Sequence, residues 1–155
     1  MIEDAWTTSA PALAKKRPGV AAKVTAATAE AVSKALSAKV VPALEQALGT
    51  LTRAELVAFD RVLEKKLYDL DRADIQAETD GSDDGFLYAR GYIVGTGQAY
   101  YRAVIADPTT AFTDLEEERI TYLPHDVFKE RFGAGIPRSR ISRETGSNRA
   151  GWKTA

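Results

Sequence analysis

A capped, amphipathic segment in the middle of the chain is the feature that most constrains the fold. Thr52 and Glu55 match a capping box, in which a hydroxyl and a carboxylate each satisfy a backbone amide at a helix start. Apolar residues then recur at three- and four-residue steps: Leu56, Phe59, Leu63, Leu67 and Leu70. This spacing predicts a helix with one face buried against other helices.

Helical patterns also cover the flanking segments. Residues 10–48 are rich in alanine, and Pro18-Gly19 and Pro42 divide them. Ser82 or Asp83 is expected to cap an aromatic helix that loosens at Gly95 and Gly97 and stops at Asp107-Pro108. A last helix is expected to begin after Thr113 and to kink at Pro124. No run alternates with a period of two over enough residues for a strand. We therefore predict an all-α, compact single-domain helical bundle of about five to six helices, with an extended basic C-terminal tail.

Charge divides the chain into regions. Residues 1–50 carry 6 basic and 4 acidic side chains, residues 51–130 carry 9 and 17, and residues 131–155 carry 6 and 1. We expect an alanine-rich helical arm at 1–44 that packs on the domain, a helical core at 45–133 and a basic extended tail at 134–155. An acidic middle and a basic end suggest that the tail folds onto the body or reaches a polyanion.

Composition excludes several classes of protein. The chain has 155 residues, enough for one domain with a real core, and no cysteine, so disulfides, thiolate nucleophiles and cysteine zinc sites are excluded. No apolar run approaches the roughly 20 residues that span a bilayer, and the start of the sequence has no basic region followed by an apolar one. A cytoplasmic protein without an export signal is expected.

The acidic and glycine-rich stretch at residues 80–97 is the main candidate for chemistry. A calcium loop that starts at Asp80 would need a carboxylate at Gly91, so we predict no metal site. Asp83 and Asp84 are expected either to cap the following helix or to pair with Arg90 or a tail arginine. The nearby glycines Gly91, Gly95 and Gly97 are attributed to close helix packing.

The same stretch resembles the domain of unknown function 4240, which occurs in bacterial proteins. The residues on matching positions are Ser82, Asp83, Asp84, Phe86, Arg90, Gly97, Tyr101, Asp107 and Pro108, with Tyr92, Ile93 and Val94 as conservative replacements. Asp80 and Ala89 depart from the pattern. The resemblance covers about residues 45–133 and implies a small helical domain of no stated activity.

We predict a non-enzymatic helical protein-binding or regulatory module in which residues 80–102 form an acidic and aromatic surface. The candidate binding residues are Asp83, Asp84, Phe86, Arg90, Tyr92 and Tyr101. A small-ligand or enzymatic pocket around Asp83, Asp84 and Arg90 is the alternative. No catalytic residue and no cofactor are assigned, because the carboxylates select no acid–base pair and His125, the one histidine, is more often structural.

The tail supports a second alternative, a nucleic-acid accessory protein. Its candidate contact residues are Arg138, Arg140, Arg143 and Trp152, since arginines can neutralise phosphates. The acidic body would repel the same polyanion, so a solvated tail, or one docked through Ile136, Ile141 and Trp152, is favoured. The expected partner is therefore another protein, with no membrane contact and an open oligomeric state.

Overall fold

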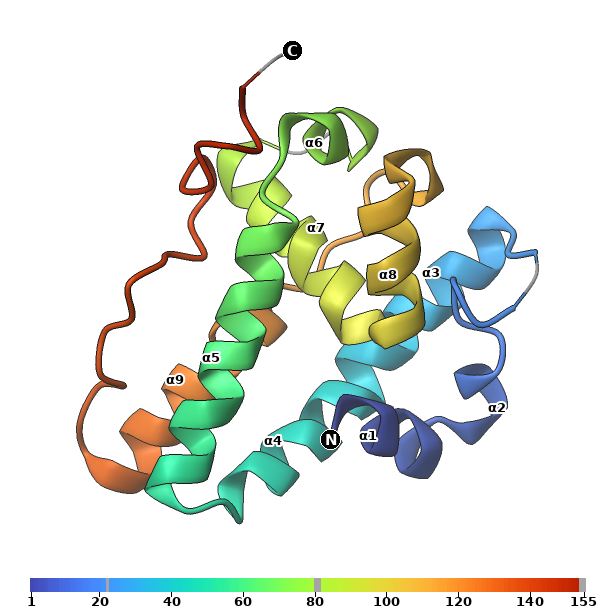
Figure 1. Ribbon diagram of the computed structural model, residues 1–155. Coiled ribbons are helices and arrows are strands. Elements are labelled where there is room, and N and C mark those ends of the chain that lie inside the picture. The colour runs from blue at the N-terminus through green and yellow to red at the C-terminus, as the bar shows by residue number, and fades with distance from the viewer. Residues whose placement is uncertain (22, 80–81, 154–155) are drawn as a thin grey trace.

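The computed structural model describes residues 1–21, 23–79 and 82–153, and these are helical without a strand (Figure 1). This confirms the all-α prediction, with more helices than expected. In chain order the elements are α1 (Ile2–Ser9), α2 (Pro11–Ala14), α3 (Ala26–Ala35), the π-helix η1 (Leu36–Val40), α4 (Val41–Gly49), α5 (Arg53–Asp69), α6 (Ala73–Thr79), α7 (Asp83–Thr96), α8 (Gln98–Ala106), the 3-10 turn η2 (Pro108–Thr110) and α9 (Glu118–Phe132). In the described residues, no helix is long and apolar enough to cross a membrane.

The middle helix, α5, forms as its sequence predicts. Both halves of the capping box are present, because the Glu55 amide donates to the Thr52 hydroxyl and the Thr52 amide donates to the Glu55 carboxylate. Its apolar face is buried through Leu56, Leu63 and Leu67. Local capping and periodicity therefore suffice to define this helix.

Helix α7 is the centre of the bundle. Every residue from Gly85 to Gly97 is buried except Tyr88, and the Ser82 hydroxyl caps the helix by accepting from the Gly85 amide at 3.2 Å. A Cβ atom at Gly91 would collide with the Glu117 carbonyl oxygen before α9, which confirms close packing there. Gly97 ends the helix with a φ of +122°, a conformation that favours glycine.

The last helix differs from its prediction at its start. It begins at Glu118, not after Thr113, whose hydroxyl instead donates to the Glu78 carbonyl at 3.1 Å. Of the kink or short break expected at Pro124, the break is absent, because the helix continues through this residue as one element. The Thr113 hydroxyl is hydrogen-bonded to the end of α6 and does not cap α9, so a tertiary contact replaces the cap that the sequence predicts.

The N-terminal arm packs on the bundle through its aromatic residue. Trp6 is fully buried, and its indole Nε1 donates to the Gly95 carbonyl at 2.8 Å. Arg17 donates to the Thr96 carbonyl at 2.7 Å. Helices α3 and α4 are joined through η1 without a non-helical residue between them, and Pro42 lies just after this π-helical turn. The expected boundary between residues 44 and 45 therefore lies inside α4.

Residues 134–153, called the tail below, contain no helix or strand. Figure 1 shows the tail leaving the end of α9 and running along one side of the bundle to the turn between α5 and α6. Ile136 is buried and Trp152 is partly buried against the core. The tail is therefore docked, which was one of the two arrangements favoured by the sequence.

Candidate functional site

Three of the six predicted surface residues lie in the interior. Phe86 and Arg90 are fully buried and Tyr92 is 1% exposed. The reason is the central position of α7, which is surrounded by other helices. Only Asp83 and Asp84 are exposed, in the first turn, where the helix dipole favours negative charge. The predicted acidic and aromatic surface is therefore wrong for Phe86, Arg90 and Tyr92, which lie in the interior.

Tyr101, the sixth predicted residue, belongs to a different environment. It lies on α8, half-buried, and its hydroxyl is 3.3 Å from an Asp69 carboxylate oxygen. The Lys66 ammonium lies 4.0 Å from the centre of its ring. Burial and the Asp69 carboxylate together raise the pKa of Tyr101 to about 12. These contacts join α8 to α5 and do not involve Asp83 or Asp84.

Arg90 is a buried donor that holds the tail. Its guanidinium donates to the Leu67 carbonyl at 2.8 Å, to the Arg143 carbonyl at 2.9 Å and to the Thr145 hydroxyl at 3.0 Å. Burial lowers its pKa to about 10, and the nearby Asp71 carboxylate opposes that shift. Within the described residues no ion pair joins Arg90 to Asp83 or Asp84, so the predicted pairing is wrong.

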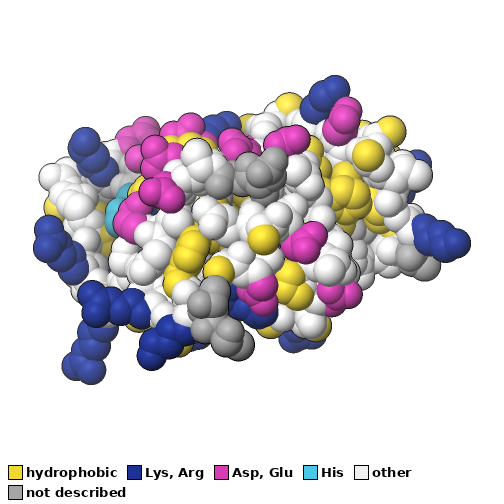
Figure 2. Space-filling model, turned by 90° about the horizontal axis from the view of Figure 1, so that it is seen from above, with side chains coloured by type: hydrophobic (Ala, Val, Ile, Leu, Met, Phe, Trp, Pro, Cys, Tyr) yellow, Lys and Arg dark blue, Asp and Glu magenta, His cyan; other side chains and the backbone are white. Residues whose placement is uncertain are grey.

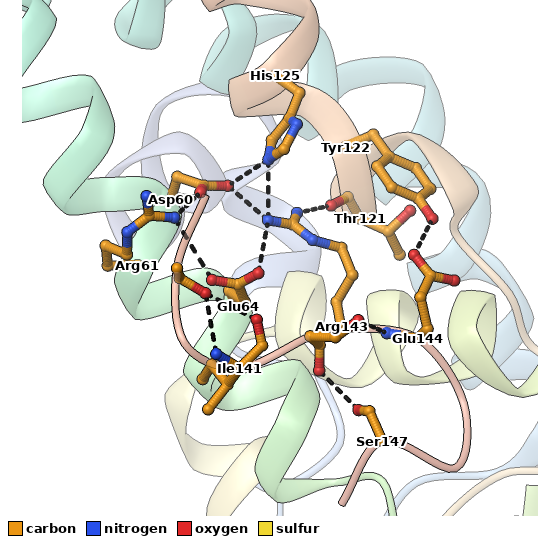
Figure 3. Close-up of polar contacts among 12 residues, drawn as sticks. Asp60, Arg61, Glu64, Thr121, Tyr122, His125, Ile141, Arg143, Glu144 and Ser147 are labelled. Atoms are coloured by element: carbon orange, nitrogen blue, oxygen red, sulfur yellow. Dashed lines mark hydrogen bonds and ion pairs between the residues drawn. The ribbon is translucent and has the colours of Figure 1, made fainter. Parts of the chain in front are cut away.

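A second arginine, from the tail, enters the body between α5 and α9. Arg143 is 4% exposed and Asp60 is fully buried, and their Nη2 and Oδ1 atoms lie 2.7 Å apart (Figure 3). A second carboxylate on α5, that of Glu64, lies 3.7 Å from Arg143 Nη2. Arg143 also donates to the Thr121 carbonyl on α9.

His125 completes this group, which we call the Arg143 socket: Asp60, Glu64, His125 and the Thr121 carbonyl. The His125 Nε2 atom lies 3.2 Å from Asp60 Oδ1 and 3.0 Å from Arg143 Nη2. One nitrogen cannot donate to the carboxylate and accept from the guanidinium together. Burial alone would raise the pKa of Asp60, but the hydrogen bonds from His125 and Arg143 hold it below its ordinary value.

Asp71 forms a second polar socket for the tail. It is fully buried in the turn after α5 and accepts hydrogen bonds from the Gly146 amide at 3.0 Å, the Asn148 amide at 2.7 Å and the Trp152 indole at 2.8 Å. The Trp152 ring lies edge-on to Phe86, with ring centres 6.0 Å apart. With the Ser147 hydroxyl, which donates to it at 3.3 Å, one carboxylate thus fixes four tail residues at once.

An open pocket of about 350 Å³ lies between α5, α9 and the first half of the tail, whose residues supply much of its lining. Its lining includes Arg61, Tyr122, His125, Ile136 and Glu144. It is the cavity where titratable side chains gather, but the guanidiniums of Arg61 and Arg143 are already engaged by Asp60 and backbone carbonyls.

An exposed acidic face lies beside the docked tail. It consists of Asp84 in α7 and Glu116 and Glu118 at the start of α9, gathered around Tyr88. Partial burial, with the carboxylates of Glu118 and Asp84, raises the pKa of the Tyr88 hydroxyl. Figure 2 shows acidic side chains gathered along one edge of this end of the molecule, with Lys and Arg side chains at the opposite edge.

Sequence reasoning missed Asp60 and Asp71, although one signal was available. Asp60 stands four residues after Leu56 and three before Leu63, so it interrupts the apolar face of an otherwise regular helix. A charged residue at such a position requires a buried partner. Asp71 carried no comparable signal, because it lies beyond the end of α5 in a turn.

The metal prediction is only partly addressed by the structure. Asp80, with which the rejected calcium loop would begin, lies outside the described residues, as does Gly81. Over the ranges that are described, no group of three or more His, Cys, Asp or Glu side chains is placed to hold a metal ion. The exposed acids around Tyr88 therefore have no assigned ion.

Comparison with known proteins places the chain in a family. The model for "Protein of unknown function (DUF4240)" matches residues 23–130, more than half of the 155 residues, and the chain belongs to that family. The match includes α3 and α4, upstream of the resemblance found in the sequence, and stops before the tail. No curated protein and no solved structure matches the chain.

Proposed function

We propose that this chain is a non-enzymatic protein-binding module whose acidic face, formed by Asp84, Glu116, Glu118 and Tyr88, binds a basic segment of another protein. Exposed carboxylates attract a basic partner during its approach, and a phenol offers contact area at small entropic cost. The observation that carries the proposal is that, among the described residues, no ion pair neutralises the three exposed carboxylates.

The acidic face already adjoins a bound basic segment of this chain. The tail lies against the same end of the bundle, where its Thr145 hydroxyl donates to the Asp83 carbonyl and Glu144 accepts from the Tyr122 hydroxyl at 2.9 Å. No basic side chain of the tail takes part in these two contacts, so they leave the acidic face open to a partner. Among the described residues, no ion pair neutralises the three exposed acids beside it.

The acids of this face are held in place by a buried neighbour. Glu117 is 5% exposed, its amide donates to the Tyr88 carbonyl at 3.0 Å, and its carboxylate accepts from the Ser37 hydroxyl. Glu116 and Glu118 flank it and are exposed. A rigid backbone between them lowers the entropy lost when a partner binds.

The alternatives fit the geometry less well. A pocket built on Asp83, Asp84 and Arg90 would need a free guanidinium, but Arg90 is fully buried and donates to backbone carbonyls and Thr145. A nucleic-acid site on the tail would lose Arg143 and Trp152, which contact Asp60 and Asp71. That site would keep only exposed arginines such as Arg138 and Arg140.

Photo-crosslinking tests the proposal directly. The variant Tyr88→p-benzoylphenylalanine, irradiated in the cells that produce the protein, should give a crosslinked species of discrete mass. The added substitutions Asp84→Asn, Glu116→Gln and Glu118→Gln should remove most of that species, because attraction between exposed charges is lost.

Two controls decide the outcome. The same photo-reactive residue at Val62, which is 58% exposed on α5, should give no such species. Neutralising Glu30, Asp126 and Glu130, which are exposed elsewhere, should leave the Tyr88 adduct unchanged. An adduct that forms equally at both positions, or that survives loss of the three acids, would contradict binding at the acidic face.

A further inference from the structure

The tail is attached to the body by separate polar anchors and not by regular secondary structure. It begins after Gly133, whose φ is +64°, and a Cβ atom at Gly133 or Gly135 would meet nothing within 4 Å. The connection to α9 is therefore open and unpacked. The contacts that hold the tail come later, from residue 136 onwards.

The first anchor selects an arginine. The Arg143 socket has two carboxylates, Asp60 and Glu64, that are 0% and 7% exposed, and a carbonyl from Thr121. A planar guanidinium can satisfy all three together, which the ammonium of lysine cannot do with the same geometry. Arg61 also pairs with Asp60, with its Nη1 atom 3.0 Å from Oδ2, so Arg143 is the second cation of a buried ion-pair network. The socket consequently favours an arginine at this position of an occupant.

The second anchor recognises backbone. Arg90 donates to the carbonyl of Arg143 and to the hydroxyl of Thr145, and the Thr145 hydroxyl also donates to the Asp83 carbonyl. A carbonyl acceptor is present in every residue, so this donor fixes the path of an extended segment and not its sequence. The buried arginine of the family pattern is thus part of a groove.

The third anchor selects a tryptophan nine residues after the arginine. Asp71 accepts from the Gly146 and Asn148 amides and from the Trp152 indole, whose ring packs on Phe86. Gly151 passes so close that a Cβ atom there would lie 2.6 Å from the Asp71 carbonyl oxygen. The groove therefore specifies an arginine, an extended backbone and a tryptophan at fixed spacing.

Receptor and occupant are separate parts of the sequence. Asp60, Asp71, Arg90 and Thr121 all fall within the family match at 23–130, whereas the residues they hold lie outside it. This division between the matched region and the tail distinguishes the tail from the helices of the bundle.

We propose that the groove between α5, α7 and α9 is a receptor for an extended segment of a partner protein with arginine and tryptophan nine positions apart, and that residues 136–153 are its resident competitor. The tethered tail occupies the groove at a high effective concentration, so a partner gains access only when the tail is loosened. This site is separate from the acidic face, because Asp60 and Asp71 are fully buried.

The full-length chain tests this inference with a labelled peptide of residues 134–153. The Arg143→Ala chain has a weakened tail and an intact receptor, so it should bind the peptide roughly 100-fold more tightly than the wild-type chain does, as measured by fluorescence anisotropy. The peptide with Arg143→Ala should bind neither chain. Adding Asp60→Asn to the Arg143→Ala chain should abolish binding.

A second variant covers failure of the first to fold. Gly151→Val collides with the Asp71 carbonyl and removes only the last anchor, so it should also admit the peptide. Equal peptide binding by wild-type and loosened chains, or binding by none of them, would overturn the proposal. A wild-type chain that dimerises by exchanging tails would also overturn it, because the occupant would then be a second copy. Neutralising Asp84, Glu116 and Glu118 should leave peptide binding intact, which separates this result from the acidic-face test.

Discussion

The two ends of the chain are held to the same central helices by different physics. The N-terminal arm inserts Trp6 into the apolar core, where Ala5 and Ala10 are also buried. The tail inserts Arg143 and surrounds Asp71 with polar donors. Apolar burial stabilises a segment in proportion to the area removed from water, whereas a buried ion pair recovers little beyond its desolvation cost. We therefore expect the arm to behave as part of the core and the tail, despite its buried Ile136, as a separable attachment.

The largest expected effect on stability comes from removing the buried aromatic residue of the N-terminal arm. Trp6→Ala removes a fully buried ring and its hydrogen bond to Gly95, and should lower the free energy of unfolding by about 3–5 kcal/mol in urea denaturation. Trp152→Ala is the matched control in the tail, where the ring is only partly buried, and should cost about 1–2 kcal/mol. Equal losses would remove the distinction between the two ends.

The second-largest expected effect is the loss of stability in Asp60→Ala, which is limited because the tail can undock from the body. Removing one partner of a buried ion pair normally costs about 3–5 kcal/mol. In Asp60→Ala the tail can undock and carry Arg143 into water, so the loss should stop at about 2 kcal/mol. Hydrogen exchange should then show faster exchange at Gly146 and Asn148 but unchanged protection in α7. Global loss of protection would show that the tail is integral to the core.

The Asp60 carboxylate should also make the tail sensitive to acid. Hydrogen bonds hold its folded pKa below the ordinary 3.8, so its contribution is present above that pH and is lost as pH falls through the lower folded value. The stability difference between the wild type and Asp60→Asn should shrink as the pH falls below about 4. Thermal unfolding of both proteins across this range measures it. A stability difference that grew on acidification would contradict a lowered pKa for Asp60 in the folded state.

The smallest effect concerns the other basic residues of the tail. Arg138 and Arg140 are exposed, and substitution of either by alanine should change the free energy of unfolding by less than about 0.5 kcal/mol. The comparison with Arg143→Ala in the same denaturation assay tests whether docking depends on one buried guanidinium or on overall basicity. A loss comparable to that of Arg143→Ala would favour general charge attraction.

Much of the helical framework could be predicted because its signals are local. The capping box at Thr52, the cap at Ser82 and the break at Gly97 each depend on residues within a few positions. The helix start predicted after Thr113 is wrong and shows the limit of local signals, because the Thr113 hydroxyl donates to the Glu78 carbonyl at the end of α6. The candidate site was predicted less well, because α7 was expected to have an exposed aromatic face but is covered on nearly all sides.

The sequence alone determined the all-α class, the capped helix ends and the division of charge between an acidic middle and a basic tail. Each follows from backbone capping, helical periodicity or composition, which do not depend on distant residues. Only the tertiary structure decided that Arg90 holds the tail, that Arg143 pairs with Asp60, and that Asp71 binds Trp152. The role of a buried charge depends on partners 53 to 83 residues away, and its cost is offset only when those partners meet in the fold.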